Sequence, residues 1–294
     1  MGILLKRYLK IIKPVSLLLA LLTYLLGAAS TNYLGSIIEA IVFFMGLIII
    51  EVLFLGMFSL SGFFQLAFKP LMEGETPRQR LRLRAILFNS SIGLMSILVI
   101  AAFLLKIQYE LNIPALLLIV LLIALALFFS IPPFKLIGSG FGELILAFMI
   151  GSLVPLFSHV LLSGTIHRLI AFMSFPVVLI LISSQIIQNF NSFSLDIKTE
   201  TNSLVTRLGI KQAGWLHNIF LLLAYLFLAL GPLVSVPWRL IFPLFISLPV
   251  ACLQIIWLQK ILQGGRALWD RLVALSAVTV GSLTYLMVVS LWSN

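Results

Sequence analysis

Long apolar stretches alternate with short polar ones along almost the whole chain. Each apolar stretch has about 20 residues, the length that an α-helix needs to cross the hydrocarbon core of a bilayer. The apolar residues are continuous within a stretch and do not alternate with polar ones, which excludes a membrane β-barrel. The pattern predicts nine membrane-spanning helices, at about 15–34, 37–62, 83–105, 112–131, 141–163, 167–190, 213–233, 238–260 and 268–291.

Three polar segments, 69–84, 132–140 and 191–212, fall on the same side of this arrangement. Residues 1–13 mix apolar side chains with cations and predict a short amphipathic helix at the membrane interface. The apolar run that follows is long enough to be the first membrane helix, so we interpret it as such and not as a cleaved signal. We expect residues 1–294 to form a single transmembrane domain.

The composition agrees with a membrane protein, because 62% of the 294 residues are hydrophobic, only 10% are charged and the mean hydropathy is +1.20. The net charge is +10, and 16 of the 19 lysines and arginines fall on the side of the N-terminus. The other side carries Lys106, Arg168 and Arg239. This asymmetry is typical of a cytoplasmic N-terminus. We therefore expect a multi-pass protein of the cell membrane, whose positive charge needs no nucleic-acid partner to explain it.

The longest polar interruption follows the sixth predicted helix. Its helical spacing places four polar residues on one face, Asn189, Ser192, Asp196 and Glu200. Such a stripe could hold a cation, with Asp196 and Glu200 as carboxylate ligands and Asn189 as a neutral oxygen ligand. The alternative is a solvated helix end, whose acidic charge is balanced by neighbouring cations.

Two further acids lie inside or at the start of predicted helices. Glu51 is about three helical turns inside the second helix, where an ionisable side chain is costly and usually faces a cavity or a partner. The alternative for Glu51 is a protonated carboxyl that is hydrogen-bonded within the core. Glu143 begins the fifth helix, where the helix dipole favours an acid, so we interpret it as structural.

Four segments together resemble the UbiA-type membrane prenyltransferases. The basic residue and proline at the start of KPVSLLLALLTYLLG (13–27) lead into the first helix as in that family, and KPLMEG (69–74) resembles the loop after its second helix. The run IPPFKLIGSGFGELILAFMIGSLVPL (131–156) is similar to the segment that joins helices 4 and 5, and SLVTRLGIKQA (203–213) to the one after helix 6. The order and spacing of the four segments agree with the family. The resemblance implies an all-α integral membrane protein, a bundle of nine transmembrane helices.

The resemblance also implies a chemistry. The family transfers an isoprenyl group from a polyprenyl diphosphate to an aromatic or lipophilic acceptor, as in the biosynthesis of quinones and related lipids. Two Asp-rich motifs, at the ends of helices 2 and 6, hold Mg²⁺ on the diphosphate, whose negative charge the cation neutralises. This implies that Asp196 and Glu200 are metal ligands and catalytic residues, together with Asn189. The resemblance also implies that four basic residues face the diphosphate: Lys135, Lys69, Lys13 and Arg207. The alternative explanation for these residues is ordinary positive charge at the membrane interface.

The chain departs from the family at both motifs. It has only two aspartates, Asp196 and Asp270, so no D-x-x-x-D motif is present. The acidic positions of the first motif fall on Phe58 and Gly62, which supply no side-chain oxygen. We therefore weigh three functions: prenyl transfer with impaired metal binding, an inactive pseudoenzyme that binds an isoprenoid or lipid or acts as a partner subunit, and a small transporter or scaffold. Only Glu51 specifically supports the third.

Overall fold

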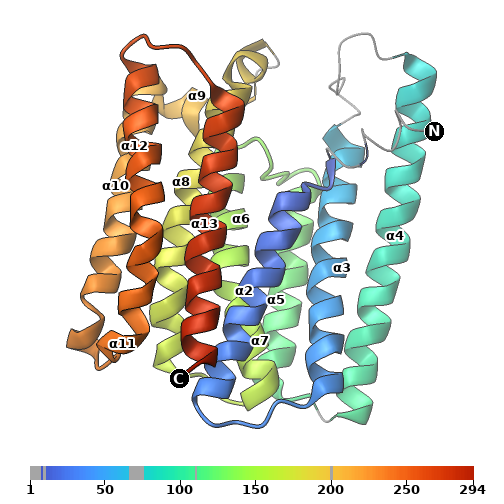
Figure 1. Cartoon of the computed structure of the whole chain (residues 1–294). Coiled ribbons are helices and arrows are strands. Elements are labelled where there is room, and N and C mark those ends of the chain that lie inside the picture. Colours follow the sequence, from blue (N-terminus) through green and yellow to red (C-terminus); the bar gives the residue numbers. More distant parts are fainter. Residues whose placement is uncertain (1–7, 9–10, 66–75, 110, 199–200) are drawn as a thin grey trace.

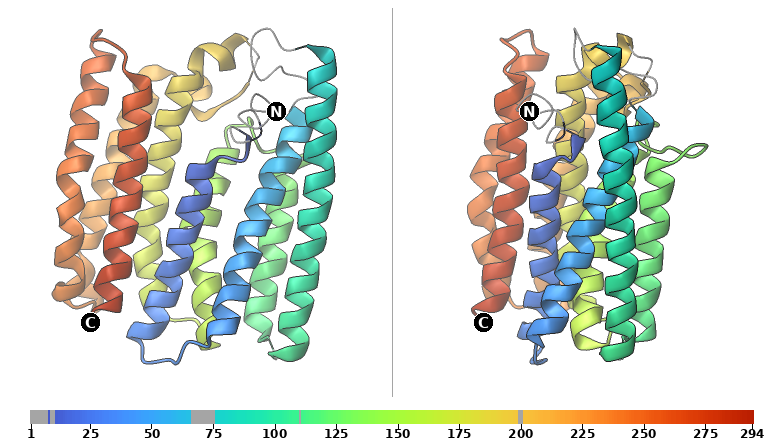
Figure 2. Two further views of the ribbon diagram at one scale, coloured as in Figure 1. Left: turned by 45° about the vertical axis from the view of Figure 1, so that its right-hand side comes forward. Right: turned by 90° about the vertical axis from the view of Figure 1, so that its right-hand side faces the viewer.

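A computed structural model describes residues 8, 11–65, 76–109, 111–198 and 201–294. Its long helices run side by side along the length of the molecule and form an all-α bundle (Figure 1; Figure 2). Within the described residues, nine stretches are long and apolar enough to cross a membrane. This number confirms the prediction from the hydrophobic pattern. The amphipathic helix predicted for residues 1–13 lies mostly outside the described residues.

The first half of the chain forms four long helices and a fifth span that is divided into three pieces. The fifth span combines α6 (Gly142–Phe148), a π-helical turn η1 (Met149–Leu153) and α7 (Val154–Ser163). Pro155 follows the π turn, and its missing N–H cannot complete the α-helical hydrogen-bond ladder, which accounts for the wider turn. The four long helices are α2 (Pro14–Tyr33), α3 (Ala40–Gln65), α4 (Pro77–Gln108) and α5 (Ile113–Ser130).

The second half of the chain closes the bundle. Its last helix, α13 (Trp269–Trp292), packs against both α2 and α8 and so joins the end of the chain to its beginning (Figure 1). The pieces α11, η3 and α12 together make one span. The remaining elements are α8 (Arg168–Lys198), α9 (Leu204–Leu208), α10 (Ile210–Ala229), η2 (Gly231–Val234), α11 (Trp238–Ile241), η3 (Phe242–Ser247) and α12 (Leu248–Leu262).

Two helices extend further into polar sequence than the hydrophobic pattern predicted. α4 begins at Pro77, because Thr76 Oγ1 accepts a hydrogen bond from the Gln79 N–H and caps the helix. α8 continues to Lys198, beyond the predicted span that ended at about residue 190. Hydropathy marks the part of a helix that lies in hydrocarbon, whereas the hydrogen-bonded helix can continue beyond it. The extension of α8 is what carries polar side chains to the candidate site.

Polar side chains inside the bundle bond from helix to helix. Tyr24 Oη donates to the Phe43 carbonyl (2.8 Å) and joins α2 to α3. Gln254 on α12 lies between two other helices, with its Nε2 2.8 Å from His217 Nε2 and its Oε1 accepting from Thr279 Oγ1 (2.8 Å). Such pairs satisfy polar groups at a depth where bilayer water is absent.

Candidate functional site

A polar cavity of about 550 Å³ lies at the end of the bundle where α2 begins and where α3 and α8 end. The starts of α2 and α6, the last turns of α3 and α8, and the α5–α6 and α8–α9 connections form its wall. Among the described residues, the polar segments 132–140 and 191–212, both expected on one side, contribute to it. Residues 69–75 of the third segment, 69–84, lie outside the described residues. Its charged and polar lining residues are Lys13, Gln65, Glu143, Gln185, Gln188, Asn189, Asn191, Ser192, Asp196, Thr201 and Ser203.

Lys13 is the one cation among the described residues that line this cavity. Its Nζ lies 5.7 Å from the ring centroid of Phe58 on α3, which is a cation–π distance. The side chain is half-buried, since one side of it borders the cavity. Burial lowers the pKa of its ammonium group, and the nearby carboxylate of Glu143 partly opposes this shift. A positive charge with so little water around it favours an anionic ligand.

Glu143, in the first turn of α6, lines the same cavity. Its Oε1 accepts hydrogen bonds from Asn189 Nδ2 (2.8 Å) and from the backbone N–H of Leu204 (3.4 Å). Its Oε2 is buried and has no hydrogen-bond partner among the described residues. Glu143 therefore does more than the helix-terminal role that we expected. The available signal was its place in the Gly-Glu-Leu of a segment that resembles the prenyltransferases.

The polar stripe on α8 lies on one face over its described part. Asn189, Ser192 and Asp196 all line the cavity. Ser192 Oγ donates to Asp196 Oδ2 (2.9 Å), while the amide N–H of Asn189 is used on Glu143. The hydrogen bond from Asn189 to Glu143 involves the amide nitrogen of Asn189 and not its amide oxygen. Glu200, the fourth member of the predicted stripe, lies outside the described residues.

The other basic residues expected at a diphosphate lie beside the cavity or outside the described residues. Lys135 is in the α5–α6 connection, where burial lowers the pKa of its ammonium group, and it is not among the lining residues. Arg207 on α9 has its guanidinium carbon 5.4 Å from the ring centroid of Phe141. The Arg207 side chain approaches Gly140 closely, and the φ of 80° at this residue suits glycine. Lys69 lies outside the described residues.

The described part of α3 offers no carboxylate to the cavity. Its last residue, Gln65, lines the wall. Phe58 packs against the lysine, and Gly62 has no side chain to contribute. Glu51 lies further along α3, is not among the lining residues, and has one buried carboxylate oxygen without a partner among the described residues. Glu51 and Asp196 therefore do not meet in this cavity.

Among the described residues, the cavity lining offers two carboxylates to a divalent cation. Glu143 and Asp196 supply carboxylates and Asn189 an amide oxygen, and Mg²⁺ prefers oxygen ligands. The unsatisfied Oε2 of Glu143 agrees with a cation at this place. Within the described residues, however, no three His, Cys, Asp or Glu side chains are grouped so that they could hold a metal by themselves. A cation here would share its coordination with the oxygens of a ligand, as Mg²⁺ commonly does with substrate phosphates.

Comparison with known proteins places the whole chain in one fold. No protein-family model matches it, and no curated protein matches its sequence. A structure of digeranylgeranylglyceryl phosphate synthase matches with a TM-score of 0.63 at 14% identity over 100% of both chains. A UbiA homolog from Archaeoglobus fulgidus, bound to GPP and Mg²⁺, matches with a TM-score of 0.60 at 12% identity, over 96% of this chain and 99% of that one.

A third solved structure agrees. It is an apo UbiA homolog from Aeropyrum pernix K1, with a TM-score of 0.58 at 16% identity over 94% of this chain and 96% of the other. The helix order, the nine candidate spans among the described residues and these full-length matches confirm the predicted architecture. The chain therefore has the fold of the UbiA-type membrane prenyltransferases.

Proposed function

We propose that the chain transfers an isoprenyl group from a polyprenyl diphosphate to a lipophilic acceptor at the polar cavity. The observation that carries this proposal is a single cavity that is lined by the half-buried Lys13 and by the carboxylates of Glu143 and Asp196. A diphosphate carries several negative charges and suits a site that offers both a fixed cation and ligands for a metal ion. The fold adds support, since a homolog of the same fold is bound to GPP and Mg²⁺.

Lys13 has the most direct role in this proposal. Its ammonium group neutralises part of the diphosphate charge from inside the cavity. Lys135, in the α5–α6 connection, and Arg207, on α9, would approach the diphosphate from beside the cavity. Lys69, which the resemblance assigns to the diphosphate, lies outside the described residues. Because a guanidinium group can bind two phosphate oxygens at once, Arg207 would also orient the leaving group.

The metal would be held at the α6–α8 side of the cavity. Glu143, Asp196 and Asn189 would supply its protein oxygens, and Glu200 would add a further carboxylate. When bound, Mg²⁺ stabilises the negative charge that develops on the departing diphosphate. Ser192 holds Asp196 by the hydrogen bond to Oδ2 and so keeps its carboxylate directed along the helix face.

The proposed transfer breaks the bond between the first carbon of the isoprenyl group and the diphosphate oxygen. The electron pair leaves with that oxygen, and the allylic carbon forms a new bond with a nucleophilic atom of the acceptor. The acceptor loses a proton, which the released diphosphate can take up. Phe129 and Leu146 form apolar parts of the cavity wall and would contact the first isoprene unit.

A second candidate function, isoprenoid binding without transfer, is favoured by the end of α3. An amide, Gln65, lines the cavity there, while Phe58 and Gly62 occupy the positions of the first acidic motif. A cavity with carboxylates on one side only holds less metal on the diphosphate and stabilises its departure less. Such a pseudoenzyme would bind the lipid or serve as a partner subunit without releasing diphosphate.

One assay separates the two functions. The full-length protein, purified in detergent, is incubated with GPP labelled in the isoprenyl chain, Mg²⁺ and a membrane lipid extract that supplies acceptors. Transfer predicts a labelled lipid product and one inorganic diphosphate released for each product formed. Retained GPP without diphosphate release supports the pseudoenzyme. If the protein neither binds GPP nor releases diphosphate while an active UbiA-type enzyme does both, the proposal is wrong.

A further inference from the structure

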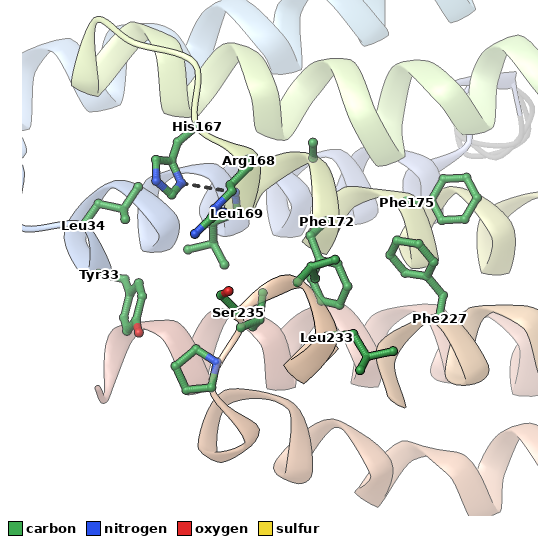
Figure 3. Close-up of a pocket in the computed structure, with 14 residues that line it drawn as sticks. Tyr33, Leu34, His167, Arg168, Leu169, Phe172, Phe175, Phe227, Leu233 and Ser235 are labelled. Atoms are coloured by element: carbon green, nitrogen blue, oxygen red, sulfur yellow. Dashed lines mark hydrogen bonds between the residues drawn. The ribbon is translucent and has the colours of Figure 1, made fainter. Parts of the chain in front are cut away.

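A second cavity, of about 720 Å³, lies at the opposite end of the bundle from the polar cavity. Its wall comes from the end of α2, the beginning of α8, the last turns of α10 and the segment from η2 to the start of α11. Figure 3 shows two distinct ends, with His167, Arg168, Tyr33 and Ser235 at one and three phenylalanines toward the other. Because helices begin and end here, the cavity lies at the level expected for a membrane interface.

The polar end of this second cavity is positively charged. Arg168 is the first residue of α8 and is exposed, and no carboxylate is among the described residues that line the cavity. His167 Nδ1 accepts a hydrogen bond from the Leu169 N–H (3.1 Å), so a neutral ring carries its proton on Nε2 and offers a donor there. The N-terminal end of the α8 dipole adds to the positive potential. An anion is the complementary ligand for this end.

The apolar end opens sideways onto the surface that would face lipid. Phe172 and Phe227 stack with their ring centroids 4.9 Å apart, and the ring centroid of Phe175 lies 4.7 Å from that of Phe227. Phe175 is 47% exposed and Leu233 is 80% exposed, so this wall is not sealed by the protein. An apolar chain can therefore reach the aromatic rings from the bilayer without crossing the polar end.

We propose that this second cavity binds a membrane lipid with an anionic phosphate headgroup. The phosphate contacts Arg168 and the Nε2–H of His167, and one hydrocarbon chain lies along Phe172, Phe175 and Phe227. A free phosphate would leave the aromatic wall uncovered, and an apolar helix of another protein would leave Arg168 without a counter-charge. Only an anionic amphiphile matches both ends of the cavity. This inference is independent of the proposed function, since the two cavities lie at opposite ends of the bundle.

The test measures lipid binding to the full-length protein by native mass spectrometry. Phosphatidylglycerol and phosphatidylcholine with the same acyl chains are compared, and the anionic lipid is expected to bind with about tenfold or higher affinity. Arg168→Gln should remove most of this preference. Arg239→Gln removes an exposed charge at the same end of the bundle, from a residue that does not line the cavity, and should leave the preference unchanged.

The contribution of the chain is tested by a second pair of variants. Phe175→Ala should weaken phosphatidylglycerol binding several-fold, whereas Phe103→Ala, an exposed phenylalanine on α4 that does not line the cavity, should not. Both residues are exposed, so the fold should tolerate either change. Equal binding of the two lipids, or equal loss in Arg168→Gln and Arg239→Gln, would overturn the proposal. Displacement of the lipid by millimolar inorganic phosphate would overturn it in favour of a free-phosphate site.

Discussion

Lys13 and Glu143 form the charged centre of the polar cavity, and each changes what the other can do. The carboxylate opposes the loss of the lysine's proton that burial favours, so the ammonium form is retained more readily. The two carboxylate oxygens of Glu143 differ. Oε1 accepts hydrogen bonds from Asn189 and Leu204, whereas Oε2 has no hydrogen-bond partner among the described residues. The cavity lining therefore combines a cation with a carboxylate that has one oxygen without a hydrogen-bond partner among the described residues.

Diphosphate binding should fall as the pH rises through the lowered pKa of Lys13. Because the pKa of Lys13 is lowered, its ammonium group loses its proton at a pH below the usual pKa of 10.5. The other charged groups that line the described cavity are the carboxyl groups of Glu143 and Asp196. At every pH above about 8 the phosphates, with a second pKa near 6, are already ionised, so a fall in binding that begins below pH 10.5 reports the lysine. Calorimetric titration with GPP measures it.

The control for this prediction is a second lysine at the same end of the bundle. Lys13→Gln should reduce GPP affinity about tenfold or more at about pH 8 and abolish the pH dependence. Lys198→Gln removes an exposed charge from the last turn of α8, outside the cavity lining, and should retain both. A decline with pH that persists in Lys13→Gln would assign the titration to another group.

The two aspartates of the chain offer a matched test of metal binding. Asp196 lines the polar cavity, whereas Asp270, in the first turn of α13, accepts a hydrogen bond from Asn191 Nδ2 (3.3 Å) and does not line it. Asp196→Asn should raise the Mg²⁺ concentration needed for half-maximal GPP binding about tenfold or more, because a ligand carboxylate is lost. Asp270→Asn should leave this concentration unchanged. The same shift in both variants would contradict the assignment of Asp196 as a ligand.

Among the elements, α8 contributes to both cavities. Its first residues, from Arg168 to Phe175, border the second cavity, and its last turns carry Asn189, Ser192 and Asp196 to the polar cavity. Its packing against α10 and α13 fixes the helix between the two sites. A change in the position of α8 would therefore change the lining of both cavities.

The contact between α2 and α7 depends on a glycine. A Cβ at Gly27 would meet the Pro155 carbonyl oxygen, and it would lie 2.6 Å from Ser158 Cβ. We expect Gly27→Ala to destabilise the protein by about 1–3 kcal/mol, because the two backbones would have to separate. Gly93→Ala on α4 places its methyl group where no described atom lies within 4 Å, and it should leave stability unchanged or slightly higher. Thermal unfolding in detergent compares them, and equal midpoints would refute the role of Gly27.

At the scale of the whole molecule, positive charge and the polar cavity lie at the same end. The connections on that side carry most of the lysines and arginines in the sequence. Two of these connections, α5–α6 and α8–α9, contribute to the wall of the polar cavity. If the positive-inside rule holds, the polar cavity faces the cytoplasm and the second cavity faces the opposite side. A water-soluble diphosphate would then reach the polar cavity directly from the cytoplasm.

This orientation can be measured with single cysteines. The natural Cys252 is replaced in Cys252→Ser, and one exposed loop residue at a time is changed, either Gln263→Cys or Thr165→Cys. A membrane-impermeant maleimide applied to intact cells should label the Thr165→Cys protein and leave the Gln263→Cys protein unlabelled until the membrane is opened. The reverse pattern would show that the N-terminus is on the outer side.

The sequence by itself determined the features that depend on local rules. The number of spans follows from the length of apolar sequence that crosses a bilayer, whichever helices pack together. The shared face of Asn189, Ser192 and Asp196 follows from helical spacing, which does not depend on other elements. Hydropathy does not determine where a helix ends, since α8 continues to Lys198, beyond the predicted span that ended at about residue 190.

Only the tertiary structure decided which residues meet. Glu143 accepts a hydrogen bond from Asn189 and lies close enough to Lys13 to change its pKa, although Glu143 is on α6, Asn189 on α8 and Lys13 directly before α2. No spacing rule relates them, because contacts between helices depend on how α2, α6 and α8 cross and pack. The second cavity has the same origin, since Arg168 and Phe227 share its wall only through the packing of α8 against α10. Local spacing determines neighbours within a helix, whereas both cavities are made by neighbours between helices.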